Sequence, residues 1–230
     1  MENTVQRQEF LSGARDASPI LLGVIPFGMI FGALAVTSGL STAAAQAMSS
    51  VVFAGSAQFI AAQLLGADAS GFVVLMVVFI VNLRHVLYSA SVAPHVDGLR
   101  PGWKFVLAYL LTDEAYAVII THYNNRGDAR ARHWYFLGAG LTLWVSWQLS
   151  TAAGIIVGAQ IPRNWPLGFV LPITFIALVV PALKDGTSVA AAVIAGTLGL
   201  LAGRLPYKTG IIVAALVGIT VGMLVESRKT

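Results

Sequence analysis

Residues 71–93 read GFVVLMVVFIVNLRHVLYSASVA, and this stretch decides the fold class. Its length suits a helix that crosses a bilayer, which requires roughly 20 predominantly apolar residues. It nevertheless carries Arg84 and His85 well inside the apolar run. A charge near the bilayer centre costs at least about 2.5–3.5 kcal/mol unless it is paired or hydrated. The stretch therefore predicts a membrane-spanning helix whose polar side faces the interior of a helical bundle.

The composition of the whole chain supports the same class. Of its 230 residues, 57% are hydrophobic and only 10% are charged, whereas soluble domains carry about 25% charged residues. The apolar residues form long blocks, which favours helices over an outer-membrane barrel. We predict an all-α integral membrane protein with one transmembrane domain over residues 1–230. Residues 1–18 would be a polar N-terminal segment and residues 226–230 a short C-terminal tail.

Several classes of function are disfavoured. The net charge of +4 is explained by Lys and Arg in loops that set topology, and no basic stripe with interleaved aromatic residues predicts nucleic-acid binding. The chain has no cysteine, which excludes disulfides and thiolate chemistry. It has neither a phosphate-binding glycine loop nor an HExxH motif. We therefore expect no cofactor, no metal site and no catalytic activity. The polar first eighteen residues predict no cleaved signal peptide.

Eight apolar stretches predict a polytopic bundle of about eight transmembrane helices. They cover residues 19–38, 42–65, 71–93, 103–122, 134–158, 167–183, 187–203 and 208–225. The sixth and seventh are short, so seven helices are the alternative. With eight, both ends face the same side, and a cytoplasmic N-terminus places the basic loop at 124–133 inside. That loop holds Arg126, Arg130 and Arg132.

A weak internal similarity suggests an inverted repeat. SGLSTAAA at 38–45 resembles DGTSVAAA at 185–192, and Pro19 corresponds to Pro166 at the same offset. Inverted repeats are common in transporters, which bind substrate near the midplane between the repeats. Chance similarity among small residues at helix starts is the alternative interpretation.

The third and fourth stretches together contain the most informative polar residues. In an antiparallel hairpin, Arg84 and Asp113 would both lie roughly 14–15 Å from the connection at 94–102, at 1.5 Å of rise per residue. At 100° per residue, Arg84, Tyr88 and Ser91 share one face of the third helix. Tyr109, Thr112, Asp113 and Tyr116 share one face of the fourth. We therefore predict that Asp113 pairs with Arg84, as part of a transport pathway or as a structural ion pair between two helices.

Two residues nearby are candidates for carrying protons. Glu114 points about 100° away from Asp113, among apolar residues, and burial disfavours the charged form of a carboxyl. His85 could serve instead, because histidine titrates near neutrality. A structural, hydrogen-bonded histidine is the alternative for His85.

The first and second stretches carry small residues and a proline rather than charges. Pro26 removes a backbone donor, and it is followed by Phe27 and Gly28. A helix broken at Pro26 would expose N–H and C=O groups that suit the carboxylate and ammonium of an amino acid. A simple proline kink is the alternative. In the second stretch, Ser56 and Gln58 offer polar groups next to small residues.

These motifs together resemble the AzlC family of branched-chain amino acid exporters. The similarity rests on Arg15-Asp16 followed by Pro19, LGVIPFG at 22–28, VFAGSAQF at 52–59, NLRH at 82–85 with YSA at 88–90, and LLTDE at 110–114 with YA at 116–117. It is strong over residues 13–120 and rests on hydropathy and length beyond them. The resemblance implies export of leucine, isoleucine, valine or similar amino acids across the bacterial inner membrane. It also implies a smaller AzlD-type membrane subunit as partner.

Taken together, these observations define an expected site for a proton-coupled exporter. We expect its substrate-binding residues to be Pro26, Phe27, Gly28, Ser56, Gln58, Asn82, Arg84, Tyr88 and Asp113. Glu114 or His85 would couple transport to protons. The alternatives are a channel-like permease for small metabolites, a scaffold subunit whose partner carries the pathway, and an intramembrane hydrolase that uses His85 with Asp113 or Ser56.

Overall fold

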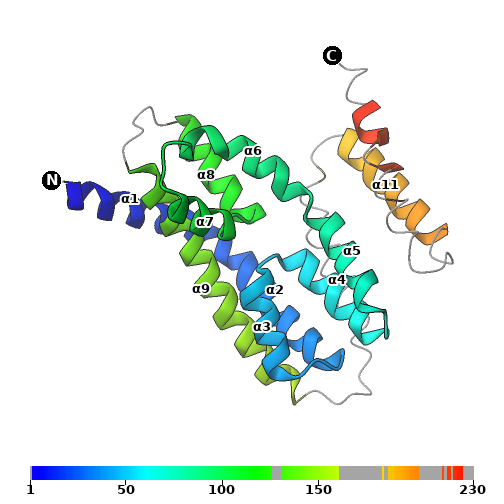
Figure 1. The fold of residues 1–230 in the computed structure, drawn as a ribbon. Helices are drawn as coiled ribbons and strands as arrows, with labels where there is room; N and C mark the ends of the chain where they lie inside the picture. The colour runs from blue at the N-terminus through cyan, green and yellow to red at the C-terminus, as the bar shows by residue number, and fades with distance from the viewer. Residues whose placement is uncertain are drawn as a thin grey trace. The chain divides into compact units, whose positions relative to one another are not determined.

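The computed structural model describes residues 2–125, 131–160, 183, 186–201, 214, 217–218 and 220–224. Helices are the only regular elements within these ranges (Figure 1). The chain divides into two compact units, Met1–Trp165 and Pro166–Thr230, and each is described by itself. The candidate site lies in the first unit.

Two long helical segments run side by side through the first unit. One consists of α1 (Glu2–Ala17), the 3₁₀ helix η1 (Ser18–Ile20) and α2 (Leu21–Thr37). Together they give one helical segment over Thr4–Thr37 that contains a stretch apolar enough to span a membrane. The other is α9 (Arg132–Gly158). They run parallel, because the backbone of Phe10 lies against Gly138 and that of Ala33 against Gly158. Glycines let two helix backbones approach this closely, which is how helices associate in lipid.

A helical hairpin follows α2. Ser41 caps α3 (Thr42–Val52) by accepting a hydrogen bond from the Ala44 N–H. The helix stops at Phe53, which has a left-handed φ of +39°, and α4 (Gly55–Gly66) starts two residues later. The new helix runs back to the end where α2 stops, because Gly66 lies beside Ser38. The tip of this hairpin is therefore at residues 53–54.

The next two helices form one bent segment. α5 (Gly71–Asn82) and α6 (Arg84–Val96) meet at Leu83 with a bend of 40°. Together they are long and apolar enough to cross a membrane.

A second hairpin is formed by α7 (Pro101–Tyr109) and α8 (Asp113–Asn125). α8 runs parallel to α6, because Tyr116 stacks on Tyr88 at 4.5 Å between centroids and Tyr123 lies 4.9 Å from His95. α7 begins beside the start of α9, where Trp103 and Trp134 are 5.1 Å apart. The first residues of α7 and the last residues of α8 therefore lie at the same end of the unit.

The tips of the two hairpins meet between the ends of the unit. The Phe53 and Tyr109 rings are 6.0 Å apart, and the Tyr109 hydroxyl donates to the Ser50 carbonyl. We call the end with the start of α1 and residues 97–100 the N-terminal end, and the end with Ser38 and Ala67 the opposite end. The α3–α4 hairpin enters from the opposite end and the α7–α8 hairpin from the N-terminal end (Figure 1).

This arrangement corrects several predictions. The stretches 42–65 and 103–122 are each a hairpin and not one crossing helix, because the backbone reverses at 53–54 and 110–112. Of the two interpretations of Pro26, the broken helix is contradicted, because α2 continues through that residue. Among the described residues, two helices suit a membrane span by length and composition, or three with α5–α6 as one span. The predicted count of eight is therefore not confirmed.

The predicted sixth, seventh and eighth stretches can be compared with the structure only in part. α11 (Gly186–Leu201) corresponds to the predicted seventh stretch. The sixth stretch lies outside the described residues except for residue 183, and the eighth is described only in pieces. Pro166 and Asp185, on which the inverted-repeat interpretation depends, also lie outside the described residues.

Candidate functional site

Arg84 lies at the centre of the junction between the two hairpins and the bent segment. Its Nη1 is 2.7 Å from Asp113 Oδ2, and its Nη2 donates to the Ser56 hydroxyl. The side chains of Arg84 and Asp113 are 32% and 36% exposed, so the pair is partly shielded. The predicted pairing of these two residues is thus confirmed. The helix arrangement from which the pairing was predicted is wrong. The pair joins the parallel helices α6 and α8, whereas the prediction assumed the two arms of an antiparallel hairpin.

The three residues of this junction all stand at helix starts. Arg84 is the first residue of α6, Asp113 the first of α8 and Ser56 the second of α4. The first N–H groups of a helix lack partners within it and carry partial positive charge. Asp113 offsets part of the positive charge that the guanidinium adds. The junction can therefore bind the carboxylate of a ligand through Arg84. It can also bind a cationic group of the ligand through Asp113.

Several buried polar atoms around the junction have no hydrogen-bond partner within the described part of the chain. They are Asp113 Oδ1, Arg84 Nε, Asn82 Oδ1, both amide atoms of Gln58, and Trp147 Nε1. Leaving a buried polar group unpaired costs about 1–3 kcal/mol. A ligand with both donors and acceptors would satisfy several of these atoms at once. This property favours a zwitterion over a purely apolar ligand.

An aromatic wall stands beside Arg84. Tyr88 and Tyr116 stack at 4.5 Å with an interplanar angle of 16°, and the Tyr116 hydroxyl donates to Ser91 Oγ over 3.1 Å. The predicted polar faces of the third and fourth stretches therefore do meet. His85 contacts the edge of the Tyr88 ring, and its Nδ1 lies 3.2 Å from the Asn82 carbonyl oxygen.

Phe27 belongs to a second aromatic group, behind the tip of the first hairpin. Its ring stacks on Phe59 at 4.5 Å and meets Trp147 at 5.8 Å. A Cβ at Gly55 would lie 3.1 Å from both Phe27 and Trp147, so these aromatic rings pack closely against the start of α4. Gln58, in the first turn of the same helix, is fully buried.

The remaining predicted residues lie differently. Pro26 is exposed on α2. A Cβ at Gly28 would lie 2.2 Å from Ser150 Oγ, so Gly28 serves the contact between α2 and α9. Glu114 follows Asp113 on α8 and is half-buried.

A polar seam between α3 and α9 was not predicted. Gln148 Oε1 accepts from Gln46 Nε2 at 2.8 Å and from Ser50 Oγ at 2.9 Å, and its Nε2 donates to the Ser49 carbonyl at 3.2 Å. Ser49 and Thr151 hydroxyls are 3.0 Å apart. These hydrogen bonds hold α3, which ends at the hairpin tip at 53–54, against α9. Glutamines within otherwise apolar stretches were the signal for this seam, since such amides pair across helices in membranes.

Comparisons with known proteins agree with these observations. The family model described as AzlC protein matches residues 19–161. The chain is similar to the inner membrane protein YgaZ of Escherichia coli, with 29% identity over 94% of this chain and 88% of that protein. An uncharacterized membrane protein of Archaeoglobus fulgidus is 32% identical over 91% of this chain and 92% of its own length.

A further relative carries a functional name. The branched-chain amino acid transport protein AzlC of Bacillus subtilis is 27% identical over 70% of this chain and 62% of its own length. No solved structure shows significant similarity to the chain.

Proposed function

The chain belongs to the AzlC protein family, and from this premise we propose that it exports branched-chain or similar apolar amino acids. The observation that carries the proposal is the Arg84–Asp113 pair, 2.7 Å long, at the meeting point of the two hairpins. The substrate carboxylate would bind Arg84 and the first backbone N–H groups of α4 and α8, which have no partner within their own helix. Its ammonium would bind Asp113, whose Oδ1 has no hydrogen-bond partner among the described residues. The apolar side chain would lie against the aromatic residues nearby.

The two hairpins suggest how access would alternate. Irregular backbone at membrane depth is tolerated where it is buried in protein or lines a water-filled cavity, as at 53–54 and 110–112. The α7–α8 hairpin would close the path from the N-terminal end, and the α3–α4 hairpin the path from the opposite end. Arg84 bonds to a residue of each, Asp113 and Ser56. A substrate that competes for these bonds would loosen one hairpin at a time.

The distribution of basic residues supports an inner-membrane location with a cytoplasmic N-terminus. Described basic residues at the N-terminal end are Arg7, Arg15, Arg100, Lys104 and Arg132. The described residues of the opposite end, 38–42, 66–71 and 158–160, contain no Lys or Arg. The hairpins bring residues 97–104 to the same end as Arg132. The excess of Lys and Arg at the N-terminal end is therefore larger than in the predicted eight-helix arrangement. Lys and Arg concentrate on the cytoplasmic side of membrane proteins.

Proton coupling and a partner subunit complete the proposal. Glu114 is next to the ion pair in an otherwise apolar part of α8, so it could release a proton when the pair opens. His85 is the second candidate, since it contacts Tyr88 beside Arg84. We propose a small AzlD-type membrane subunit as the partner with which the chain acts.

Export from cells loaded with branched-chain dipeptides tests this proposal. We expect Arg84→Ala to lower the export rate at least tenfold, because the substrate would lose its carboxylate partner. Glu114→Gln should retain substrate-driven exchange but lose the response to a proton gradient. Arg100→Ala is the matched control, since Arg100 is exposed at the N-terminal end, outside the site. Unchanged export in Arg84→Ala would refute the site, and flux that never saturates would indicate a channel.

A further inference from the structure

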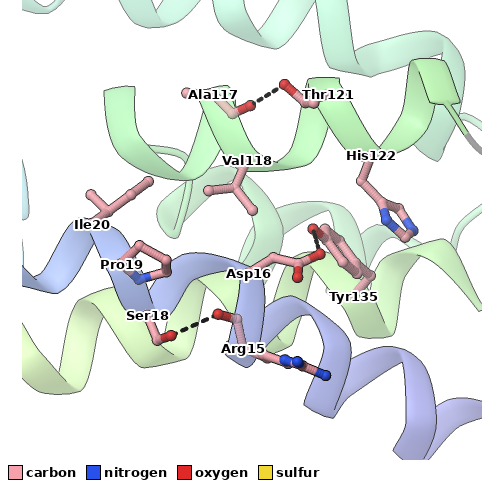
Figure 2. Close-up of a pocket in the computed structure, with 10 residues that line it drawn as sticks. All are labelled: Arg15, Asp16, Ser18, Pro19, Ile20, Ala117, Val118, Thr121, His122 and Tyr135. Carbon is pink, nitrogen blue, oxygen red and sulfur yellow. Dashed lines mark hydrogen bonds between the residues drawn. The ribbon is translucent and has the colours of Figure 1, made fainter.

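A cavity lined by both apolar and polar residues lies at the N-terminal end, apart from the Arg84 junction. Its volume is about 690 Å³, and it is formed by the end of α1, by η1, by α8 and by Tyr135 of α9 (Figure 2). Small-molecule sites are typically clefts of about 300–1,000 Å³. The cavity includes Arg15, Asp16 and Pro19, which the sequence comparison singled out and which the proposed mechanism does not use.

The carboxylate of Asp16 is exposed in this cavity and is hydrogen-bonded to α9. Its Oδ2 accepts a hydrogen bond of 2.8 Å from the Tyr135 hydroxyl. The Tyr135 ring is in turn stacked on His122, with 3.5 Å between centroids and an interplanar angle of 11°. His122 Nε2 lies 3.3 Å from Glu9 Oε2, which ties the ring to α1. The bond from Tyr135 uses one carboxylate oxygen, so Asp16 can present the other to a cation.

The rest of the cavity combines an apolar wall with a positive rim. Pro19, Ile20, Ala117 and Val118 line it, and Figure 2 shows Val118 directed from α8 toward Asp16. The guanidinium of Arg15 lies at the rim and is directed away from Val118 (Figure 2). A hydrogen-bonded carboxylate beside an apolar wall is complementary to an ammonium group attached to an apolar side chain.

Along α8, the cavity lies between the Arg84 junction and the N-terminal end. Ala117, Val118 and Thr121 follow Glu114 by three, four and seven residues on α8, so they share its face. Thr121 is eight residues beyond Asp113, which corresponds to about 12 Å along the helix axis. A molecule in the cavity would therefore be separated from the ion pair by about two turns of α8.

We infer that this cavity is a second binding site for the transported amino acid, occupied before the substrate reaches Arg84. Asp16 binds the ammonium group, and the apolar side chain lies against Ala117 and Val118. This inference rests on the proposed function, because it assigns the same class of ligand to both sites. It adds an entry site at the end of the protein that we propose to be cytoplasmic.

Equilibrium binding of radiolabelled leucine to the full chain in lipid nanodiscs tests the inference. We expect two molecules per chain in the wild type, one in Asp16→Asn, one in Arg84→Ala and none in the double variant. Ala117→Phe fills the cavity without removing a charge and should also leave one. Arg7→Gln is the control, because Arg7 is exposed on α1 outside the cavity, and it should retain two.

The possible results separate the two proposals. Two molecules bound in both Asp16→Asn and Ala117→Phe would overturn the entry site. A single wild-type site that is lost only in Arg84→Ala would also overturn it, but would leave the proposed function intact. A single site that is lost only in the cavity variants would support the cavity and refute the site at Arg84. No leucine binding by the wild type would refute both.

Discussion

Arg84 is held by two residues that come from different parts of the chain, Ser56 and Asp113. The high cost of an unpaired charge inside a membrane predicted correctly that Arg84 and Asp113 pair, although the equal depth was calculated for an antiparallel hairpin that the structure does not contain. Ser56 was expected in the same site, but its hydrogen bond to Arg84 was not predicted. Its position depends on the reversal at residues 53–54, which follows from packing between hairpins.

The ion pair at the junction should matter far more than an ion pair at the surface. We expect Asp113→Asn to lower the leucine export rate at least tenfold, since it removes the negative partner of Arg84 and of the substrate ammonium. Asp97→Asn is the matched control, because Asp97 forms an ion pair of 3.4 Å with Lys104 but is 91% exposed. Exposed pairs contribute about 0–1 kcal/mol. Equal loss of export in both variants would contradict a specific role for the junction.

At the scale of helices, the sequence contains a capping signal for the start of α8, although the hydropathy shows no break there. Thr112 accepts a hydrogen bond from the Ala115 N–H at 3.3 Å, and Asp113 and Glu114 occupy the first turn. Thr, Asp and Glu in this order are a signal for a helix start. The apolar residues on either side favoured one continuous span instead. That interpretation was wrong because a run of apolar residues does not reveal whether the backbone reverses within it.

The parallel contact between α2 and α9 should tolerate no added methyl group. A Cβ at Gly154 would lie 2.0 Å from the Met29 carbonyl oxygen, whereas a Cβ at Gly23 would meet nothing within 4 Å. We expect Gly154→Ala to lower the free energy of unfolding by about 1–3 kcal/mol, as overpacking does. Thermal unfolding in detergent measures this. Gly23→Ala, on the same pair of helices, should be neutral or slightly stabilising, and a comparable loss in both variants would refute the close contact.

At the scale of the whole first unit, the hairpins decide which loops share a side of the membrane. The native chain has no cysteine, so single cysteines can report this directly. We expect Asp97→Cys and Asn124→Cys to react with an impermeant maleimide only after the cells are permeabilised. Ala67→Cys should react in intact cells, because residue 67 lies at the opposite end. A span at 103–122 would instead place residues 97 and 124 on opposite sides, so labelling of residue 97 alone from outside would refute the hairpin.

The amino-acid sequence by itself determined the all-helical class, the apolar segments 19–38, 71–93 and 134–158, and the pairing of Arg84 with Asp113. These features depend on composition, on the length of apolar runs and on the high free energy of a charge in lipid, all of which are local properties. The tertiary structure alone decided that residues 42–65 and 103–122 reverse at their midpoints. It also decided that the tips meet at Tyr109 and Phe53, and that Asp16 faces a cavity with Tyr135. The direction of a chain after a break is set by the partners that it packs against, and those partners are distant in sequence.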